Sequence, residues 1–186
     1  MNKAIFLDRD GTINVEKNYL YKIEDFEFLP GVINALKQLQ AAGYLLIIIT
    51  NQSGIARGYY TERDFKKLND WMLEELNNKG VSITRVYYCP HHPDAAKGEY
   101  RVACECRKPK LGLFYKAVEE YDIDLSLSYA IGDKIRDCAI CSTTNCHGFL
   151  INNSENNVTI EQVKKGMYRN VRYVDSLQDC VREILD

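Results

Sequence analysis

Three apolar segments of the sequence are each followed by polar residues of the types found in catalytic and ligand-binding sites. The first runs into two aspartates and a glycine, the second into a hydroxyl and two amides, and the third into another pair of aspartates. The residues concerned are Asp8-Arg9-Asp10-Gly11-Thr12, Thr50-Asn51-Gln52-Ser53-Gly54 and Gly132-Asp133-Lys134-Ile135-Arg136-Asp137. If the segments are neighbouring parallel strands, their carboxyl ends bring these side chains to one rim, where open α/β sheets bind ligands.

The carboxylates of this set suit a divalent cation and the chemistry of phosphate esters. Asp8 and Asp10 are followed by Gly11 and can converge on a hard ion such as Mg²⁺, and Asp133 can complete the site. Such a cation offsets the repulsion between an anionic nucleophile and a phosphate monoester. We therefore expect Asp8 to be the nucleophile and Asp10 the general acid and base. Asp137 would orient Asp133 from behind.

A phosphate site also needs hydrogen-bond donors and a fixed positive charge. The hydroxyl of Thr50 and the backbone amides of Asn51 and Gln52 can hold phosphate oxygens in the transition state. Lys108, with Arg107 beside it, precedes a predicted helix and is the candidate cation that clamps the phosphoryl group. Together these residues predict a site for phosphoryl transfer.

Two short pairs of metal-binding residues bracket a long loop. Cys89 and His91 form one pair, Cys104 and Cys106 the other, and one residue separates the members of each pair. Three thiolates and one imidazole make a closed tetrahedral Zn²⁺ site, which is structural because no position stays open for water. His92 is an alternative to His91 as the fourth ligand. The zinc would hold the phosphate-binding cations next to it in place.

The remaining cysteines are interpreted as core residues. The chain has seven cysteines, an odd number, and it begins without an export signal, which argues against a disulfide framework. Cys138 and Cys141 have the spacing of the buried face of a predicted helix that follows Asp133. We expect these two, with Cys146 and Cys180, to be buried thiols and not ligands of a second metal.

The overall composition excludes several classes of protein. Lys and Arg number 24 against 26 Asp and Glu, for a net charge of −2, and no basic cluster suggests a nucleic-acid or membrane-surface partner. The longest apolar run, Tyr44–Ile49, is far shorter than the ~20 residues that span a bilayer. We expect a cytoplasmic protein that binds neither nucleic acid nor membrane.

Short apolar runs, rich in β-branched and aromatic residues, alternate with stretches of helical periodicity. Helices are predicted to begin at Thr61 and Ser176 and to end at Gly43 and Gly80. The runs have the length of strands and cover residues 3–8, 44–50, 83–89, 129–133, 148–151 and 171–174. This alternation predicts an α/β protein: a single Rossmann-like domain over residues 1–186, with a mostly parallel sheet and helices on both faces.

Two segments interrupt the alternation. Residues 12–30 are polar and aromatic, and we expect them to form a small flap, folded as a hairpin, over the strand ends. Residues 89–106 form the predicted zinc loop. Loops of this length inside a compact domain are usually functional.

The motifs resemble those of the haloacid dehalogenase (HAD) superfamily of aspartate-nucleophile phosphohydrolases, in the same order along the chain. Its motifs correspond here to Asp8–Thr12, Thr50, Lys108 and Gly132–Asp137. The resemblance implies that Asp8 is phosphorylated and then hydrolysed. It also implies that Mg²⁺ is held by the carboxylates of Asp8 and Asp133 and by the backbone carbonyl of Asp10.

Within this superfamily, the zinc loop and the segment Thr50–Gly58 look like those of the D-glycero-D-manno-heptose 1,7-bisphosphate 7-phosphatases. Members of that family have no large cap domain and remove the C7 phosphate on the route to nucleotide-activated heptose. The resemblance therefore implies a small phosphorylated sugar as the substrate, and we expect the protein to be a monomer. The substrate-binding residues that it implies are Glu16, Lys17, Asn18, Tyr19, Thr50, Asn51, Gln52, Ser53, Arg107, Lys108 and Lys134.

Three other functions share parts of this pattern. The histidinol-phosphate phosphatases share the zinc loop, and Lys110 after Pro109 is more like that group. Receiver domains of signalling proteins also place Asp, Thr or Ser, and Lys around Mg²⁺, but they hold the phosphoryl group instead of releasing it. A zinc-dependent interaction module would show no Mg²⁺-dependent turnover.

Overall fold

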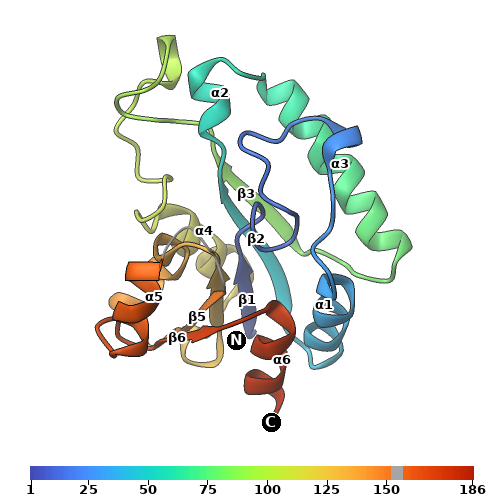
Figure 1. The fold of residues 1–186 in the computed structure, drawn as a ribbon, viewed down its shortest axis with the longest axis vertical. Helices are drawn as coiled ribbons and strands as arrows, with labels where there is room; N and C mark the ends of the chain where they lie inside the picture. Colours follow the sequence, from blue (N-terminus) through green and yellow to red (C-terminus); the bar gives the residue numbers. More distant parts are fainter. Residues whose placement is uncertain (152–156) are drawn as a thin grey trace.

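The computed structural model describes residues 1–151 and 157–186, which build one open α/β sheet (Figure 1). Its strands are β1 (Ala4–Leu7), β2 (Leu45–Asn51), β3 (Arg85–Cys89), β4 (Tyr129–Gly132), β5 (His147–Ile151) and β6 (Val171–Val174). The six strands found in the described ranges run parallel in the order β3-β2-β1-β4-β5-β6. Each predicted strand is present within two residues of its expected bounds, and the predicted α/β class is confirmed.

Helices connect the strands. The α-helices are α1 (Val32–Ala41), α2 (Ser53–Arg57), α3 (Glu62–Asn78), α4 (Gly112–Tyr121), α5 (Asn157–Lys164) and α6 (Leu177–Leu185). The 3₁₀ helices are η1 (Ile23–Asp25), η2 (Gly98–Tyr100), η3 (Leu125–Leu127) and η4 (Ile135–Ser142). The helix predicted after Asp133 is thus the 3₁₀ helix η4. Throughout the described ranges, no helix combines the length and the apolar character needed to cross a bilayer.

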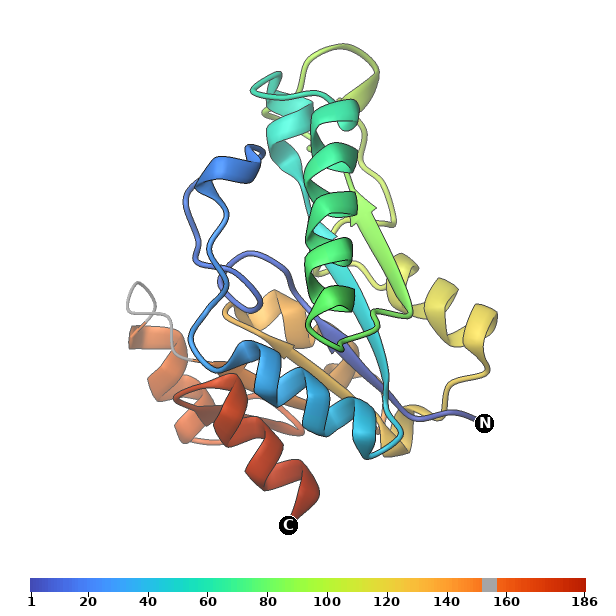
Figure 2. The ribbon, with the colours of Figure 1, turned by 90° about the vertical axis from the view of Figure 1, so that its right-hand side faces the viewer.

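The central strand β1 supplies side chains to two hydrophobic cores, one on each face of the sheet. Ile5 and Leu7 pack with buried residues of α1, α3 and α6, whereas Ala4 and Phe6 pack with those of α4 and α5. Figure 2 shows α1, α3 and α6 together on the side nearest the viewer. Alternation along a strand sends successive side chains to opposite faces, so a fully apolar strand needs helices on both. The expected two-sided cover is confirmed.

The predicted helix boundaries follow from local chemistry. The Thr61 hydroxyl accepts a hydrogen bond from the backbone N–H of Asp64, whose carboxylate in turn accepts from the Thr61 backbone, and this capping box starts α3. The Ser176 hydroxyl caps α6 in the same position. Gly43 and Gly80, with φ of +84° and +80°, follow the ends of α1 and α3.

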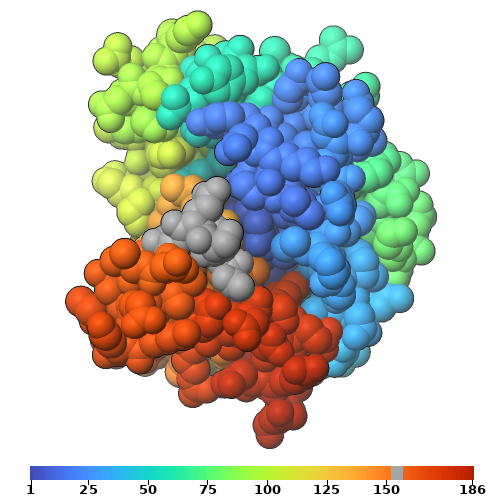
Figure 3. Space-filling view, viewed as in Figure 1, coloured from blue at the N-terminus to red at the C-terminus, as the bar shows by residue number. Residues whose placement is uncertain are grey.

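The flap, residues 12–30, has two arms that pair antiparallel over a short stretch, in keeping with the small hairpin expected there. Its two arms meet in an isolated antiparallel bridge between Asn14 and Phe28, and η1 forms the return. Backbone hydrogen bonds of 2.9 Å, from the Val15 N–H to the Glu27 carbonyl and from the Leu29 N–H to the Ile13 carbonyl, flank this bridge. At the outer turn, Asn18 and Tyr19 have φ of 49° and 62°, a left-handed conformation that is common in turns and rare in strands. In Figure 3 the flap (blue) lies against the α2 region (teal).

Candidate active site

The carboxyl ends of β1, β2 and β4 meet at one rim of the sheet, as parallel strands require. A pocket of about 280 Å³ opens there, and in the space-filling view a hollow lies between the flap and the zinc loop (Figure 3). The pocket is lined by Asp8, Asp10, Glu16, Asn18, Tyr19, Asn51, Gln52, Ser53, Arg57, Tyr60, Arg107, Lys108, Lys134 and Arg136. Because most of these side chains are charged or polar, the pocket suits a small anionic, hydrogen-bonding ligand.

Three carboxylates lie close together at the floor of the site. Asp8, Asp133 and Asp137 can each offer one oxygen, and these oxygens lie within 4.8 Å of one another. Burial and nearby carboxylates raise the pKa of Asp8 to about 6, although Lys108 opposes the shift. Burial, together with the charges of Asp8 and Asp137, raises the pKa of Asp133 to about 7. A hard divalent cation such as Mg²⁺ fits this donor set, since it would offset the mutual repulsion.

Two glycines leave space for these carboxylates. Gly11 has φ of +84°, and a Cβ there would fall against the carboxylate of Asp133. A Cβ on Gly132 would fall against the carboxylate of Asp137. The turn after β1 and the end of β4 can therefore approach the carboxylates closely only because both positions lack a side chain.

Lys108 follows the last cysteine of the zinc loop, and its side chain extends to the carboxylate cluster. Its side chain is almost fully buried, and Nζ lies 2.8 Å from Asp8 Oδ1 and 2.7 Å from Asp137 Oδ1. A third contact, of 2.6 Å, joins Nζ to the backbone carbonyl of Ile49. Burial alone would lower the pKa of Lys108, but the two carboxylates outweigh it and raise this pKa. The ammonium is thus a fixed positive charge next to Asp8.

The side chain of Asp10 turns away from the carboxylate cluster. Arg9, which is 1% exposed, donates from Nη2 to both Asp10 oxygens at 2.9 Å. Asn14 Nδ2 and Gln52 Nε2 each donate to one of these oxygens at 3.0 Å. Burial would raise the pKa of Asp10, but these three donors hold it below its usual range. The carboxylate is thus ionised and oriented in the free protein.

The residues at the end of β2 and just after it differ in their access to the pocket. Asn51, Gln52 and Ser53 line the pocket, whereas Thr50 is buried beneath it and its hydroxyl accepts a hydrogen bond from Gln52 Nε2 at 2.9 Å. Asn51 holds the backbone of Lys108 at two points. Its Nδ2 donates to the Lys108 carbonyl at 3.1 Å, and its Oδ1 accepts from the Lys108 N–H at 3.0 Å.

The flap brings part of the predicted substrate-binding set to the pocket mouth. The predicted residues that line the pocket from this side are Glu16, Asn18 and Tyr19, with Lys134 opposite. Lys134 Nζ lies 3.4 Å from Glu16 Oε2, which connects η4 to the flap. Lys17 is not part of the lining. It is exposed and forms an ion pair of 3.3 Å with Glu27.

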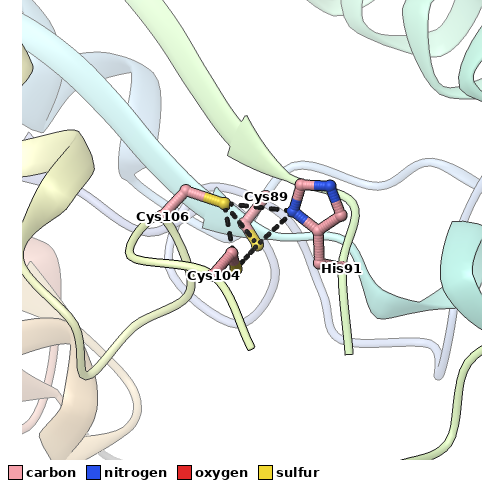
Figure 4. Close-up of side chains that lie close together, drawn as sticks. All are labelled: Cys89, His91, Cys104 and Cys106. Atoms are coloured by element: carbon pink, nitrogen blue, oxygen red, sulfur yellow. Dashed lines mark hydrogen bonds between the residues drawn. The ribbon is translucent and has the colours of Figure 1, made fainter. Parts of the chain in front are cut away.

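The four predicted zinc ligands come together (Figure 4). Cys106 Sγ lies 3.0 Å from the sulfur of Cys89 and 3.2 Å from that of Cys104. His91 Nδ1 lies 3.3 Å from Cys106 Sγ and completes the group. His92 does not join it, because its Nδ1 accepts backbone hydrogen bonds from Asp94 and Ala95. Three sulfurs and one imidazole nitrogen facing one point fit tetrahedral Zn²⁺.

The backbone next to the cysteine–histidine cluster also carries residues of the pocket. Cys106 directly precedes Arg107, whose Nη1 donates to the carbonyl of His91 at 3.3 Å. On the other side, the backbone N–H of Gln52 donates to the carbonyl of Cys89 at 2.8 Å. Fixing the cluster therefore fixes residues on two sides of the pocket.

The other cysteines are core residues, as predicted. Cys138, Cys141, Cys146 and Cys180 are all buried in the hydrophobic cores. Within the described ranges, the groups able to hold a metal are the cysteine–histidine cluster and the carboxylate cluster, and neither contains these four thiols.

Five residues at the site escaped prediction from sequence. Arg57, Tyr60 and Arg136 line the pocket, and Arg9 and Asn14 donate hydrogen bonds to the carboxylate of Asp10. Arg9, Arg57 and Arg136 lie inside the polar motifs that follow β1, β2 and β4, which was the available signal. Their side-chain directions depend on tertiary contacts, so spacing did not single them out.

Comparison with known proteins agrees with the motifs. The fold is shared with solved structures of HAD-superfamily proteins, and the site has the carboxylates, lysine and threonine that the superfamily motifs require. Fold and site thus define a phosphatase of the HAD superfamily. A family model described as polynucleotide kinase 3 phosphatase matches residues 3–167, and the chain belongs to that family.

Curated relatives are similar over most of the chain. The D-glycero-β-D-manno-heptose-1,7-bisphosphate 7-phosphatase of Haemophilus ducreyi is 46% identical, over 88% of this chain and 90% of the relative. The protein of the same name from Pasteurella multocida is 52% identical over 74% of each chain. A D,D-heptose 1,7-bisphosphate phosphatase from B. bronchiseptica, solved with magnesium and phosphate, has a TM-score of 0.82 and 29% identity, with 98% of both chains covered.

Proposed function

We propose that this protein is a Mg²⁺-dependent phosphomonoester hydrolase that removes the C7 phosphate of D-glycero-D-manno-heptose 1,7-bisphosphate, a step toward nucleotide-activated heptose. The main support is the setting of Asp8, a buried carboxylate at the pocket whose oxygen lies 2.8 Å from the ammonium of Lys108. A nucleophile held beside a fixed cation is what attack on a phosphate ester requires. The relatives described above support the choice of substrate.

In the proposed reaction, an oxygen of Asp8 attacks the phosphorus of the substrate. The ester P–O bond breaks, and the leaving oxygen takes a proton from Asp10, so that an aspartyl phosphate remains. Water then attacks this phosphorus and gives a proton to Asp10, while the bond from phosphorus to the Asp8 oxygen breaks and inorganic phosphate leaves. Lys108 offsets negative charge in both steps.

The protonation state of Asp10 in the free protein suits the second step, the attack of water. Because its donors hold Asp10 ionised, Asp10 can accept the proton of the attacking water without further change. For the first step, the proton must be taken up as the anionic substrate enters, since added negative charge raises the pKa of a nearby carboxyl. Each proton transfer of this kind is typically worth about 10²- to 10⁴-fold in rate.

Mg²⁺ would be held by the carboxylates of Asp8 and Asp133 and by the backbone carbonyl of Asp10. When bound, it supplies positive charge that screens the phosphate from the carboxylates. Asp137 belongs to the same cluster and forms an ion pair with Lys108, so its charge would act on the bound cation as well as on the ammonium.

The rest of the pocket supports a small anionic sugar as substrate. Arg107, Arg57 and Arg136 line one pocket, so several cations face the space that the sugar would fill. Burial and the neighbouring charge of Arg136 lower the pKa of Arg107, which is the pattern expected of cations gathered without enough anions. Glu16 and Asn18 add hydrogen-bonding groups for sugar hydroxyls at the mouth.

The cysteine–histidine cluster is proposed to bind one structural Zn²⁺. Support comes from its closed set of four ligand atoms and from its covalent link to Arg107 and Lys108. We further propose that the protein works in the cytoplasm as a monomer.

The test is a comparison of kcat/KM among substrates. The two anomers of heptose 1,7-bisphosphate, histidinol phosphate, a 3′-phosphorylated oligonucleotide and a simple phosphate ester would be assayed with Mg²⁺. We expect a preference of more than tenfold for a heptose bisphosphate, and turnover that Asp8→Asn abolishes without unfolding the protein. Single phosphorylation without turnover would instead indicate a receiver-like role, and a preference for histidinol phosphate or the oligonucleotide would refute the substrate.

A further inference from the structure

A buried chain of hydrogen bonds runs from Tyr60 to the carboxylate of Asp10. The Tyr60 hydroxyl donates to Gln52 Oε1 at 2.6 Å. Gln52 Nε2 in turn donates to Asp10 Oδ2 at 3.0 Å and to the Thr50 hydroxyl at 2.9 Å. Tyr60 and Gln52 are only 6% and 2% exposed, so water does not readily replace these bonds.

The neighbours of Gln52 permit one orientation of its amide. An ionised carboxylate only accepts hydrogen bonds, so Asp10 must face the NH₂ group. The carbonyl oxygen then faces the Tyr60 hydroxyl and Arg9 Nη2, which lies 3.5 Å away. A flipped amide would set oxygen against carboxylate and NH₂ against guanidinium. Asp10 and Arg9 therefore fix which end of Gln52 meets the carboxylate, and the Tyr60 hydroxyl, by donating to Oε1, holds the amide in that position.

We propose that Tyr60 is a positioning residue for proton transfer: acting through Gln52, it holds the carboxylate of Asp10 in the place from which it serves the leaving oxygen and the attacking water. This inference rests on the role of Asp10 in the proposed function. It adds a tyrosine from the α2–α3 connection, whose effect on the reaction passes through a second side chain.

The surroundings of Tyr60 are built to hold it in place. Its ring stacks on that of Tyr21 with centroids 5.3 Å apart, and it packs in a cluster with Ile55 and Phe65. A Cβ on Gly54 would collide with the Tyr60 ring, so the absence of a side chain at Gly54 leaves the space in which the ring lies next to Gln52. Burial also raises the pKa of Tyr60, which keeps the hydroxyl protonated and therefore a donor.

The first test measures kcat/KM for a series of alkyl and aryl phosphates with graded leaving-group pKa. Protonation by a general acid matters most for poor leaving groups. In Tyr60→Phe, we expect kcat/KM for alkyl phosphates to fall roughly 5- to 30-fold, as loss of a hydrogen bond allows, and that for p-nitrophenyl phosphate to fall less than about threefold. The control, Tyr21→Phe, removes a hydroxyl from the stacked ring and should leave both values unchanged.

The second test is a double-mutant cycle with heptose bisphosphate as substrate. If Tyr60 acts through Asp10, Tyr60→Phe should cost nothing further in an Asp10→Asn background. If Tyr60 instead contacts the sugar, its cost should be the same in both backgrounds, and the inference is overturned. Equal losses along the leaving-group series, or no loss at all, would also overturn it.

A further variant keeps the inference testable if Tyr60→Phe fails to fold. Gln52→Met removes both ends of the hydrogen-bonded link at similar size, and it should show the same dependence on leaving group. Failure of the proposed function appears differently, as a wild-type protein that hydrolyses neither heptose bisphosphate nor the alkyl and aryl phosphates.

Discussion

Replacing Lys108 with methionine tests how strongly the site depends on its buried ammonium. In the native protein this group lies within 2.8 Å of carboxylate oxygens on both Asp8 and Asp137. Lys108→Met keeps most of the side-chain volume but leaves two neighbouring carboxylates buried without their cation. Breaking a buried ion pair from one side costs about 3–5 kcal/mol. For a chain of 186 residues, that corresponds to a fall in Tm of roughly 6–20 °C.

The assay is thermal unfolding followed by circular dichroism, first in buffer without Mg²⁺. The matched control is Lys110→Met, which removes an exposed ammonium 2.8 Å from Glu105 and should shift Tm by no more than about 2 °C, because surface ion pairs contribute little. Added Mg²⁺ should recover part of the loss in Lys108→Met, since the cation would partly compensate the carboxylates, while phosphatase activity stays abolished. A Lys108→Met protein that melts like the wild type would refute the reasoning.

Two further predictions concern the metal sites. By elemental analysis the wild-type protein should hold about one zinc per chain. The His91→Ala variant should lose most of this zinc, whereas His92→Ala should keep it. The opposite pattern would show that His92, and not His91, is the fourth ligand. Gly11→Ala should lower activity and stability because its Cβ meets the Asp133 carboxylate. Gly31→Ala has a similar φ of +76° and open space around it, so it should cost only the backbone strain of about 1–2 kcal/mol and leave activity intact; equal losses of activity would contradict the clash.

Much of the fold was predictable because strand periodicity and local capping are properties of adjacent residues. The run Tyr44–Thr50 became β2 with a shift of one residue, and the capping box at Thr61 starts α3. Parallel pairing then brings Asp8 and Asp133 to one rim without further information. The cysteine–histidine cluster follows from spacing in the same way, whereas the carboxylate cluster contains Asp137 in place of the expected side chain of Asp10.

The supporting contacts were not predictable, because they join segments far apart in the sequence. Nothing near Asp137 indicates that it meets Lys108, and nothing near Asp10 indicates that Gln52 would hold its carboxylate. The path of the flap was not predictable in detail, because the positive φ at Tyr19 and its neighbour is set by packing of the turn, which the hydrophobic pattern does not report.

The cysteine–histidine cluster helps to hold Lys108 in place at the pocket. Lys108 ends a long excursion between β3 and α4, and its backbone is held by the side chain of Asn51 on one side and by the cluster on the other. Removing zinc should therefore act on catalysis through the position of Lys108. The metal would not contact the substrate, since its four ligand positions are filled by the protein.

The most direct test of the account is to trap the covalent intermediate on Asp8. The protein would be mixed with heptose 1,7-bisphosphate and Mg²⁺, quenched in acid, reduced with borohydride, which converts an aspartyl phosphate to homoserine, and mapped by mass spectrometry. The account predicts homoserine at position 8, formed with substrate and absent from Asp8→Asn. Modification at another aspartate, or turnover with no modified residue in a quench that traps a known aspartyl phosphate, would contradict it.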